Sequence, residues 1–577
     1  MNTNSINTIS KYLLLFLLIL TGASCNDNDD AEDTSIPVLI SQNINDGDVV
    51  GPSGYVELTF SKAMRQAPDT EIYFNGGVVR VSINYEKVRY TFSGMENKEC
   101  TFEVPAGALT DMQGRAYDED FFLSFTAKSE ISGGGKVFDA IVDSKGNGDY
   151  TTLQAAINAI TTPPTSPYKI FIANGTYNEC VRINKNKPFV HLIGESRDGV
   201  KIQFAVNRVD DSSNATSWPY SIFNENSPAR KAGYSEDQNT VVLIEATDFY
   251  AENISIINLY GAFSNRHTGG LGKNGQAEAL INREDRFALN NCLLVSYQDT
   301  WWTRYWNNTT PHRAYVYNSW IEGHTDYIWG SGDVLIENST FYNTGNDGGS
   351  VITASRTSES DKYGYVIKDC TVNGDDTKFS FGRSQATTTK TVWINTKLKM
   401  DIIDSHWGYG GQVPTLYAEY NTIDKNGNMI AESKTITSGN VSFTSSVLTA
   451  SEAAKYTYEN IITIDSWNPK EYMETPLAAP TNVNLSGNTL TWDAVSGAAG
   501  YLIFMNGNYA GQTTDTTVTL TNTDESNIYT VKTVSQYGTV SEPIRFNKEF
   551  FVTSSANIMY ETKNSIFLKD NLYAQIY

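Results

Sequence analysis

The sequence predicts an all-β chain: a right-handed parallel β-helix domain flanked by small β-sandwich modules. Three observations support this fold class. Aromatic residues make up 12% of the 577 residues, with 34 Tyr and 25 Phe against 16 Pro, which favours many short strands over helical bundles. Short alternating strands mark both flanks of the central region. Between them, Asn or Asp followed by a small residue recurs at uneven intervals, as in a solenoid.

The N-terminal residues carry an export signal. Lys11 precedes an apolar run over residues 12–20, which is too short to cross a bilayer and is typical of a secretory signal. Small residues then lead to Cys25, an order that resembles the lipobox of bacterial lipoproteins; an ordinary cleaved signal is the alternative. We expect a signal peptide over 1–24, lipidation of Cys25 and an acidic solvated tether over 25–36. The expected location is the outer membrane, facing the cell surface or the periplasm.

Two modules and two connecting segments surround the centre. Residues 37–128 alternate in short strands and resemble a bacterial Ig-like β-sandwich. Residues 476–547 resemble a fibronectin type III domain. The glycine-rich residues 129–135 predict a flexible linker. For the tail, residues 548–577, a sorting signal and a strand of an unfinished domain both remain open.

The central residues 136–472 carry the repeat that predicts the β-helix. Its intervals are 38, 27, 20, 31 and 26 residues, between Asn253, Asn291, Asn318, Asn338, Asp369 and Asn395. Like residues stack from coil to coil in such a fold, so Cys292 and Cys370 are predicted as packing residues rather than reactive thiols. Residues 153–160 predict a short amphipathic helix that caps the open end of the solenoid.

Charge and cysteine content exclude several protein classes. Lys+Arg 43 minus Asp+Glu 65 gives a net charge of -22, which disfavours nucleic-acid binding because phosphate contacts need a basic face. Residues 136–472 hold 29 basic and 37 acidic side chains (net -8), so the flanks, with 14 and 28, hold -14. Five scattered cysteines without a CxxC pair, and no HExxH, argue against a disulfide framework and against zinc.

Five motifs in the centre occur in an informative order. They are residues 175–179 (GTYNE), 276–280 (QAEAL), 297–300 (YQDT), 323–330 (GHTDYIWG) and 382–383 (GR). Together they resemble the pectin methylesterase (pectinesterase) family. The resemblance covers roughly residues 136–472 and is supported by residues 148–153, 416–420 and 448–467.

The resemblance implies a metal-independent ester hydrolase without a cofactor, acting on methylated pectin. Asp326 would be the nucleophile and Asp299 the acid/base, while Gln276 and Gln298 would donate to the oxyanion. Arg383 would hold Asp326 ionised and oriented, and with Gln276 would contact substrate. Ester hydrolysis without a metal needs these roles, and two carboxylates fill two of them if their pKa values are pushed apart. The two aspartates lie 27 residues apart, about one coil plus an insertion.

Aromatic residues near these aspartates predict sugar stacking. For Trp301 and Tyr327 we expect a place in the substrate groove. Trp302 and Trp329 belong to the same cluster, for which core packing is the alternative. For Trp306 both interpretations stay open.

Two positions depart from the family pattern. His324 stands where the family has a small residue, so it either shifts the pH profile or points outward. The sequence Arg383-Ser384-Gln385 lacks the family's tryptophan, which leaves chain-length and methylation-pattern preference open.

Each site residue alone has a structural explanation: a turn Asp, a Gln in a polar ladder, a surface Arg. Their joint occurrence in family order favours catalysis. Two alternatives remain: an esterase or thioesterase of this fold acting on another substrate, and a surface glycan-binding lipoprotein without catalysis. A pectate lyase would need an acidic calcium cluster and a basic proton abstractor, and the sequence shows no such grouping. A solenoid with appended modules requires no partner chain, so a monomer is expected.

Overall fold

The computed structural model describes residues 34–95, 97–132, 134–206, 240–260, 276–303, 312–345, 348–521, 526–542 and 544–546. The predicted signal peptide, Cys25, most of the tether, Trp306 and the tail lie outside these ranges. Among the described residues, none of the helices combines the length and the apolarity that a membrane span requires. The chain divides into two compact units.

Residues 39–127 form two β-sheets and a short ribbon. The sheet orders are β1-β3-β8-β7 and β2-β11-β9-β5-β6, and β10 pairs with β4. The long strands β3, β9 and β11 alternate buried and more exposed side chains, as their sequences predict. Phe92 and Phe125, one from each sheet, bring their rings to 5.2 Å. The strands are β1 (Leu39–Gln42), β2 (Val49–Val50), β3 (Gly54–Phe60), β4 (Met64–Gln66), β5 (Ile72–Phe74), β6 (Gly77–Val79), β7 (Ser82–Asn84), β8 (Lys87–Phe92), β9 (Lys98–Val104), β10 (Leu109–Asp111) and β11 (Phe121–Ala127).

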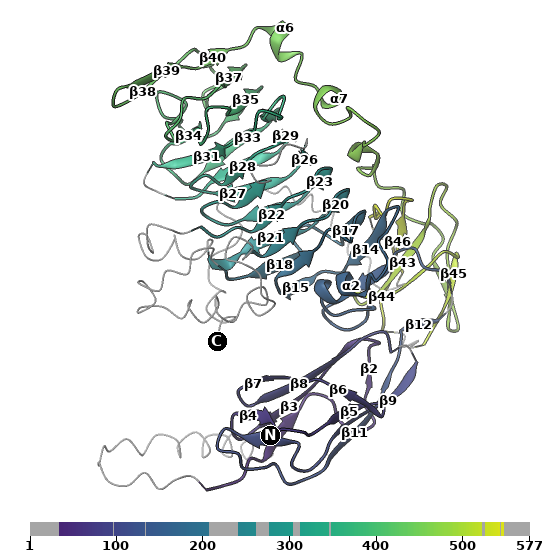
Figure 1. Ribbon diagram of the computed structural model, residues 1–577. Helices are drawn as coiled ribbons and strands as arrows, with labels where there is room; N and C mark the ends of the chain where they lie inside the picture. Colours follow the sequence, from purple (N-terminus) through teal and green to yellow (C-terminus); the bar gives the residue numbers. More distant parts are fainter. Residues whose placement is uncertain are drawn as a thin grey trace, which may run out of the picture. The chain divides into compact units, whose positions relative to one another are not determined.

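The central region forms a parallel β-helix, in which the strands of successive coils line up into three parallel sheets (Figure 1). This confirms the predicted fold class. The eleven-stranded sheet contains β13 (Ala140–Val142), β14 (Tyr168–Ile172), β17 (Val190–Gly194), β20 (Phe249–Glu252), β23 (Phe287–Asn290), β26 (Arg313–Tyr317), β29 (Asp333–Glu337), β32 (Tyr365–Lys368), β35 (Lys390–Ile394), β37 (Leu416–Tyr420) and β40 (Ser446–Val447). The eight-stranded sheet contains β15 (Gly175–Asn178), β18 (Val200–Phe204), β21 (Ser255–Asn258), β24 (Leu293–Val295), β27 (Trp320–Gly323), β30 (Thr340–Asn343), β33 (Thr371–Gly374) and β36 (Lys397–Leu398). The seven-stranded sheet contains β16 (Val181–Ile183), β19 (Val242–Ile244), β22 (Leu280–Asn282), β25 (Trp301–Thr303), β28 (Ile328–Gly330), β31 (Ser350–Ser355) and β34 (Phe379–Gly382).

The repeated Asn and Asp residues mark one turn of each coil. All six predicted positions have a positive φ, between 48° and 57°, a region that Asn and Asp enter more readily than other non-glycine residues. Their side chains form ladder contacts, such as Asn291 Nδ2 donating to Asn253 Oδ1 at 2.8 Å. Cys292 and Cys370 follow two of these turns and are buried in the core, where burial raises the pKa of each thiol to about 12. Their prediction as packing residues is confirmed.

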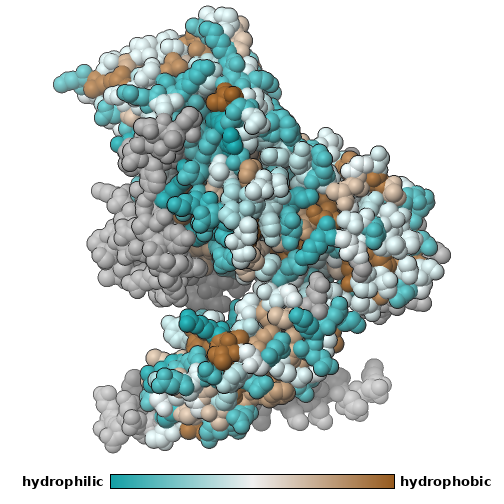
Figure 2. All heavy atoms as spheres, turned by 45° about the vertical axis from the view of Figure 1, so that its right-hand side comes forward, coloured by the Kyte–Doolittle hydropathy of each residue, from teal (hydrophilic) through white to brown (hydrophobic). Residues whose placement is uncertain are grey.

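A single apolar core fills the solenoid, and a short helix covers its N-terminal end. Helix α2 (Leu153–Ala159) buries three apolar side chains in this core, as predicted. Glu179 accepts hydrogen bonds from the first two backbone N–H groups of α2, at 2.8 and 2.9 Å. Lys187 Nζ donates to two carbonyl oxygens at the other end, at 2.7 and 2.6 Å. Both charges complement the helix dipole and stabilise a helix of only two turns. The outer surface of the solenoid seen in Figure 2 is mainly hydrophilic to neutral, as expected when the large apolar side chains lie inside.

A C-terminal segment covers the outer face of the eleven-stranded sheet. It contains α6 (Ala450–Ala453), α7 (Tyr458–Ile461) and the 3-10 helix η2 (Pro469–Glu471). Arg313, with 3% of its side chain exposed, pairs with Asp285 at 2.6 Å and with Asp465 of this segment at 2.9 Å. A hairpin of β38 (Thr435–Ser438) and β39 (Val441–Thr444) precedes the segment.

The C-terminal module consists of two four-stranded sheets, in the orders β12-β45-β42-β41 and β44-β43-β46-β47. Its strands are β41 (Asn484–Ser486), β42 (Thr489–Thr491), β43 (Gly500–Met505), β44 (Asn508–Thr513), β45 (Thr517–Leu520), β46 (Tyr529–Val534) and β47 (Ile544–Phe546). Strand β12 (Ile131–Ser132) comes from the segment expected to be a flexible linker and pairs antiparallel with β45. Ile131 is buried in the core of the module, so an apolar side chain and an available strand edge outweigh the glycine-rich composition around it.

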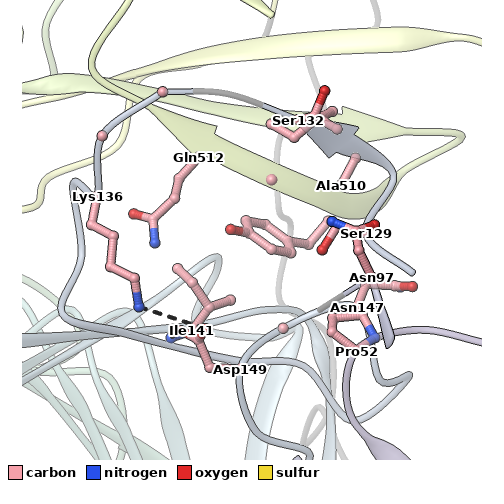
Figure 3. A pocket seen from close by; sticks show the side chains of 16 residues that line it. Pro52, Asn97, Ser129, Ser132, Lys136, Ile141, Asn147, Asp149, Ala510 and Gln512 are labelled. Carbon is pink, nitrogen blue, oxygen red and sulfur yellow. Dashed lines mark hydrogen bonds and ion pairs between the residues drawn. The ribbon is translucent and has the colours of Figure 1, made fainter. Parts of the chain in front are cut away.

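The chain that follows β12 is held by the same module. Gln512 Oε1 accepts hydrogen bonds from the backbone N–H groups of Val137 and Phe138, each at 2.8 Å. Lys136 Nζ lies 3.8 Å from Asp149 beside Gln512 (Figure 3). Phe504 of the module also packs against Phe171 on the outer face of the eleven-stranded sheet, and the two ring centres lie 6.4 Å apart.

Candidate active site

The two aspartates of the YQDT and GHTDYIWG motifs occupy the same place in successive coils. Asp299 precedes β25 and Asp326 precedes β28, each by two residues. Trp301 pairs with Ile328, and Gln298 forms a parallel bridge with Thr325, so the register sets the two aspartates opposite one another. Their φ values are 58° and 50°, which turns both chains sharply as they enter the sheet. The predicted one-coil relation is therefore confirmed.

Arg383 lies two further coils along the same sheet, directly after β34. Its guanidinium forms a fork on the Asp326 carboxylate: Nε donates to Oδ1 at 2.8 Å and a terminal nitrogen to Oδ2 at 2.5 Å. Two parallel charged hydrogen bonds fix both the position and the plane of the carboxylate. The pair predicted from the motifs is thus in direct contact.

Burial and this ion pair act in opposite directions on Asp326. Only 4% of the residue is exposed, and burial raises the pKa of its carboxyl above the ordinary value. The hydrogen bonds and the charge of Arg383 lower that pKa, with a smaller contribution from His324. The fork favours the ionised carboxylate, as the resemblance implies, but burial outweighs it, and the pKa of Asp326 lies above its ordinary value. This burial could not be predicted from the sequence, since turn aspartates are commonly exposed.

The two glutamines extend the same edge of the seven-stranded sheet. Gln276 forms a parallel bridge with Gln298, which in turn bridges to Thr325. The Ala277 N–H donates to the Gln298 carbonyl at 3.2 Å, and the Asp299 N–H to the Thr325 carbonyl at 3.1 Å. Both glutamines are half-buried. Their side chains thus start from adjacent backbone positions beside Asp299.

The structure contradicts the groove positions expected for Trp301 and Tyr327. Both are fully buried in the solenoid core; the Trp301 indole donates to Asn282 at 2.6 Å, and the Tyr327 hydroxyl to Asn343 at 3.3 Å. For Trp301 the physical reason is strand alternation: Trp301 and its partner Ile328 point inward, so their successors Trp302 and Trp329 point outward. Tyr327 precedes β28, in the turn that carries Asp326, and packs into the core beside Ile328. The latter two rings lie 4.6 Å apart on the outer face, and Trp329 is half-buried. The alternation of side chains along each strand is the signal that would have predicted the outward positions of Trp302 and Trp329.

Within the described ranges, no group of three or more His, Cys, Asp or Glu side chains is arranged to hold a metal ion. His324, one of the two departures from the family pattern, is buried and does not point outward.

Comparison with known proteins gives the family of this chain. The family model described as Pectinesterase matches residues 139–465. The chain belongs to the pectinesterase family. It is 28% identical over 268 residues to "Probable pectinesterase 49" of Arabidopsis thaliana, covering 46% of this chain and 64% of that protein. It is 30% identical over 239 residues to a pectinesterase of Sitophilus oryzae, covering 40% of this chain and 61% of that protein.

A pectin methylesterase from carrot is among the similar solved structures, with 21% identity and a TM-score of 0.45 over 60% of this chain and 99% of the carrot protein. The family match coincides closely with the region of predicted resemblance, residues 136–472. The pectinesterase family prediction is therefore confirmed, whereas the individual residue roles are not tested by these comparisons.

Proposed function

We propose that this chain removes methyl esters from pectin, releasing methanol and leaving free galacturonate carboxylates. One observation carries the proposal: the Arg383 fork on the buried Asp326, one coil away from Asp299 in a pectinesterase fold. A binding protein has no need of a buried carboxylate that is fixed in plane beside a second one. The relatives named above are themselves called pectinesterases.

The first half-reaction forms an acyl-enzyme on Asp326. One carboxylate oxygen attacks the ester carbon, and the carbonyl electrons move onto the oxygen. Amide N–H groups of Gln276 and Gln298 stabilise that oxyanion, a contribution of about 2–4 kcal/mol per donor in other enzymes. When the tetrahedral intermediate collapses, the bond to the methoxy oxygen breaks, and Asp299 gives that oxygen its proton. Methanol leaves, and an anhydride joins the pectin carboxyl to Asp326.

The second half-reaction restores the enzyme. Asp299, now ionised, takes a proton from a water molecule as the water oxygen attacks the carbonyl of the anhydride. Collapse breaks the bond to the Asp326 oxygen, which departs as a carboxylate paired with Arg383. Asp299 is thereby protonated again for the next turnover. The galacturonic acid loses its remaining proton to solvent, and its carboxylate is then a like charge beside the Asp326 carboxylate, in a solenoid of net charge -8, so that repulsion assists its release.

Methanol release tests the proposal. The full chain, incubated with highly methylated pectin, is expected to release methanol at a rate that calcium chelation does not change. The control substrate is demethylated pectin, from which no methanol can form. Pectin binding without methanol release would instead favour the glycan-binding alternative, and hydrolysis confined to other esters or thioesters would favour the second enzyme. Release of unsaturated oligosaccharides would indicate a lyase.

The residues before the described ranges support a second proposal, that Cys25 is acylated and tethers the enzyme to the outer membrane. The apolar run at 12–20 and the small residues before Cys25 motivate it. Cells expressing the chain are expected to incorporate labelled palmitate into it and to retain it in the membrane fraction. The Cys25→Ala variant should incorporate no label, and equal labelling of both chains would contradict the proposal.

A further inference from the structure

His324, two residues before Asp326, is buried, with 5% of the residue exposed. Its imidazole stacks on the ring of Tyr297, with the ring centres 4.6 Å apart and the planes 16° apart. Nδ1 lies 2.7 Å from Thr325 Oγ1, and Nε2 lies 3.5 Å from Asp376 Oδ2. Both ring nitrogens thus face oxygen atoms, so the imidazole is held at both of them.

Asp376 is held by backbone and hydroxyl donors at both of its carboxylate oxygens. Its Oδ1 accepts from the backbone N–H groups of Gly348 and Thr377, at 2.6 and 2.7 Å. Its Oδ2 accepts from the Ser350 N–H at 3.1 Å and from the Ser350 hydroxyl at 2.5 Å. None of the Asp376 side chain is exposed. A carboxylate held by this many donors is a rigid anionic partner for a cation.

A glycine makes room for this pair. A Cβ added at Gly345 would lie 2.7 Å from His324 Cδ2, 3.3 Å from its Nε2 and 3.6 Å from Asp376 Oδ2. Gly345 also has a φ of 141°, which a residue with a side chain rarely adopts. The coil between His324 and Asp376 therefore carries no side chain at the point where the two residues meet.

The turn that carries His324 is hydrogen-bonded through its backbone to the turn of Asp299, and it also carries Asp326. The N–H groups of His324 and Thr325 donate to the Tyr297 carbonyl at 2.7 and 3.2 Å, and the Asp299 N–H donates to the Thr325 carbonyl at 3.1 Å. The stacked rings of Tyr297 and His324 thus lie on the two turns that carry Asp299 and Asp326. A shift of the imidazole would move both turns together.

We propose that His324 is a positioning residue of the pectinesterase site: stacked on Tyr297 and held by Thr325 and Asp376, its ring fixes the turn of Asp326 and, when protonated, places a positive charge beside that carboxylate. The inference rests on the proposed function. The titratable groups facing the imidazole are Asp376 from the turn after β33, the Tyr297 phenol from the turn before β25, and Asp326 on its own turn. The charge of His324 acts to lower the pKa of Asp326, in the same direction as Arg383.

Three variants of the full chain test this inference. In Asp376→Asn the imidazole loses its carboxylate partner, and in His324→Gln both the ring and its charge are lost. Asp375→Asn is the matched control, because Asp375 is the exposed neighbour in the same turn. With methylated pectin, we expect His324→Gln to shift the acid limb of the kcat profile upward by about half a pH unit or more, with KM within about twofold of wild type. Asp376→Asn removes a carboxylate rather than a positive charge, so it should lower kcat without that upward shift. Asp375→Asn should follow the wild-type profile.

A second measurement separates this inference from the proposed function. Carbodiimide modification of Asp326, followed by peptide mass spectrometry, reports protonation of the carboxyl without turnover. Its pH midpoint should move upward in His324→Gln and should not move upward in Asp376→Asn or Asp375→Asn. A shifted midpoint in a chain that releases no methanol would overturn the proposed function alone. A wild-type midpoint in His324→Gln, or a wild-type kcat in Asp376→Asn, would overturn the positioning role.

Discussion

Replacement of Asp326 by Asn is expected to lower methanol release from methylated pectin at least about 10³-fold, because an amide oxygen cannot form the acyl-enzyme. The substitution leaves the turn in place, since Asn tolerates the positive φ of 50° at this position. It also keeps an acceptor for Arg383, of which 35% of the side chain is exposed. The loss should therefore fall on kcat, with pectin binding and the unfolding temperature close to wild type.

Asp369→Asn is the matched control for this experiment. Asp369 is also a turn aspartate with a positive φ, 56°, but it is exposed and belongs to the Asn ladder at a different turn of the coil. If Asp326 were only a turn residue, both variants would behave alike. Equal methanol release from wild type and Asp326→Asn would rule out Asp326 as the nucleophile.

Stability is expected to fall on acidification because of His191. This residue on β17 is fully buried against Tyr250 and Tyr472, and within the described part of the chain neither ring nitrogen has a hydrogen-bond partner. Burial, with the nearby charge of Lys169, lowers the pKa of His191 to about 3. Between that value and about 6.5, the unfolded chain binds a proton that the folded chain does not. Stability is thus complete above about pH 6.5 and falls progressively towards pH 3, by about 2 kcal/mol at pH 5.

Urea unfolding at several pH values, followed by tryptophan fluorescence, checks this expectation. His191→Phe keeps an aromatic ring in the same place and removes the titrating group. Its free energy of unfolding should depend less on pH, by about 2 kcal/mol between pH 7.5 and pH 5. A constant offset at every pH would report altered packing only, so the slope is the readout. An unchanged slope would show that His191 does not titrate as its burial requires.

The β-helix and its family motifs could be predicted because their signals are local. A turn that needs a positive φ selects Asn or Asp in each coil, so the repeat is visible in the sequence although its period varies. The motifs that carry Asp299, Asp326 and Arg383 are short runs, and one coil of separation follows from their spacing. The prediction of the catalytic domain succeeded for this reason.

The direction in which the neighbouring side chains point could be predicted less well. Trp301 and Trp302 have the same chemistry, and only the register of β25 against β28 decides that the first points into the core and the second outward. The strand formed by Ile131 depends similarly on an edge of β45, almost 400 residues away in the sequence.

The sequence by itself determined the coil, the family motifs and the two aspartates that stack on one face. Only the tertiary structure decided how strongly each carboxylate is buried and which distant charges lie beside it. Asp376 reaches His324 across a glycine, and Arg383 reaches Asp326 across two coils. A solenoid places residues side by side when they are one or more coils apart, so the number of residues in each coil decides which charged side chains become partners. Because the turns contain insertions of different lengths, that number cannot be read from the sequence.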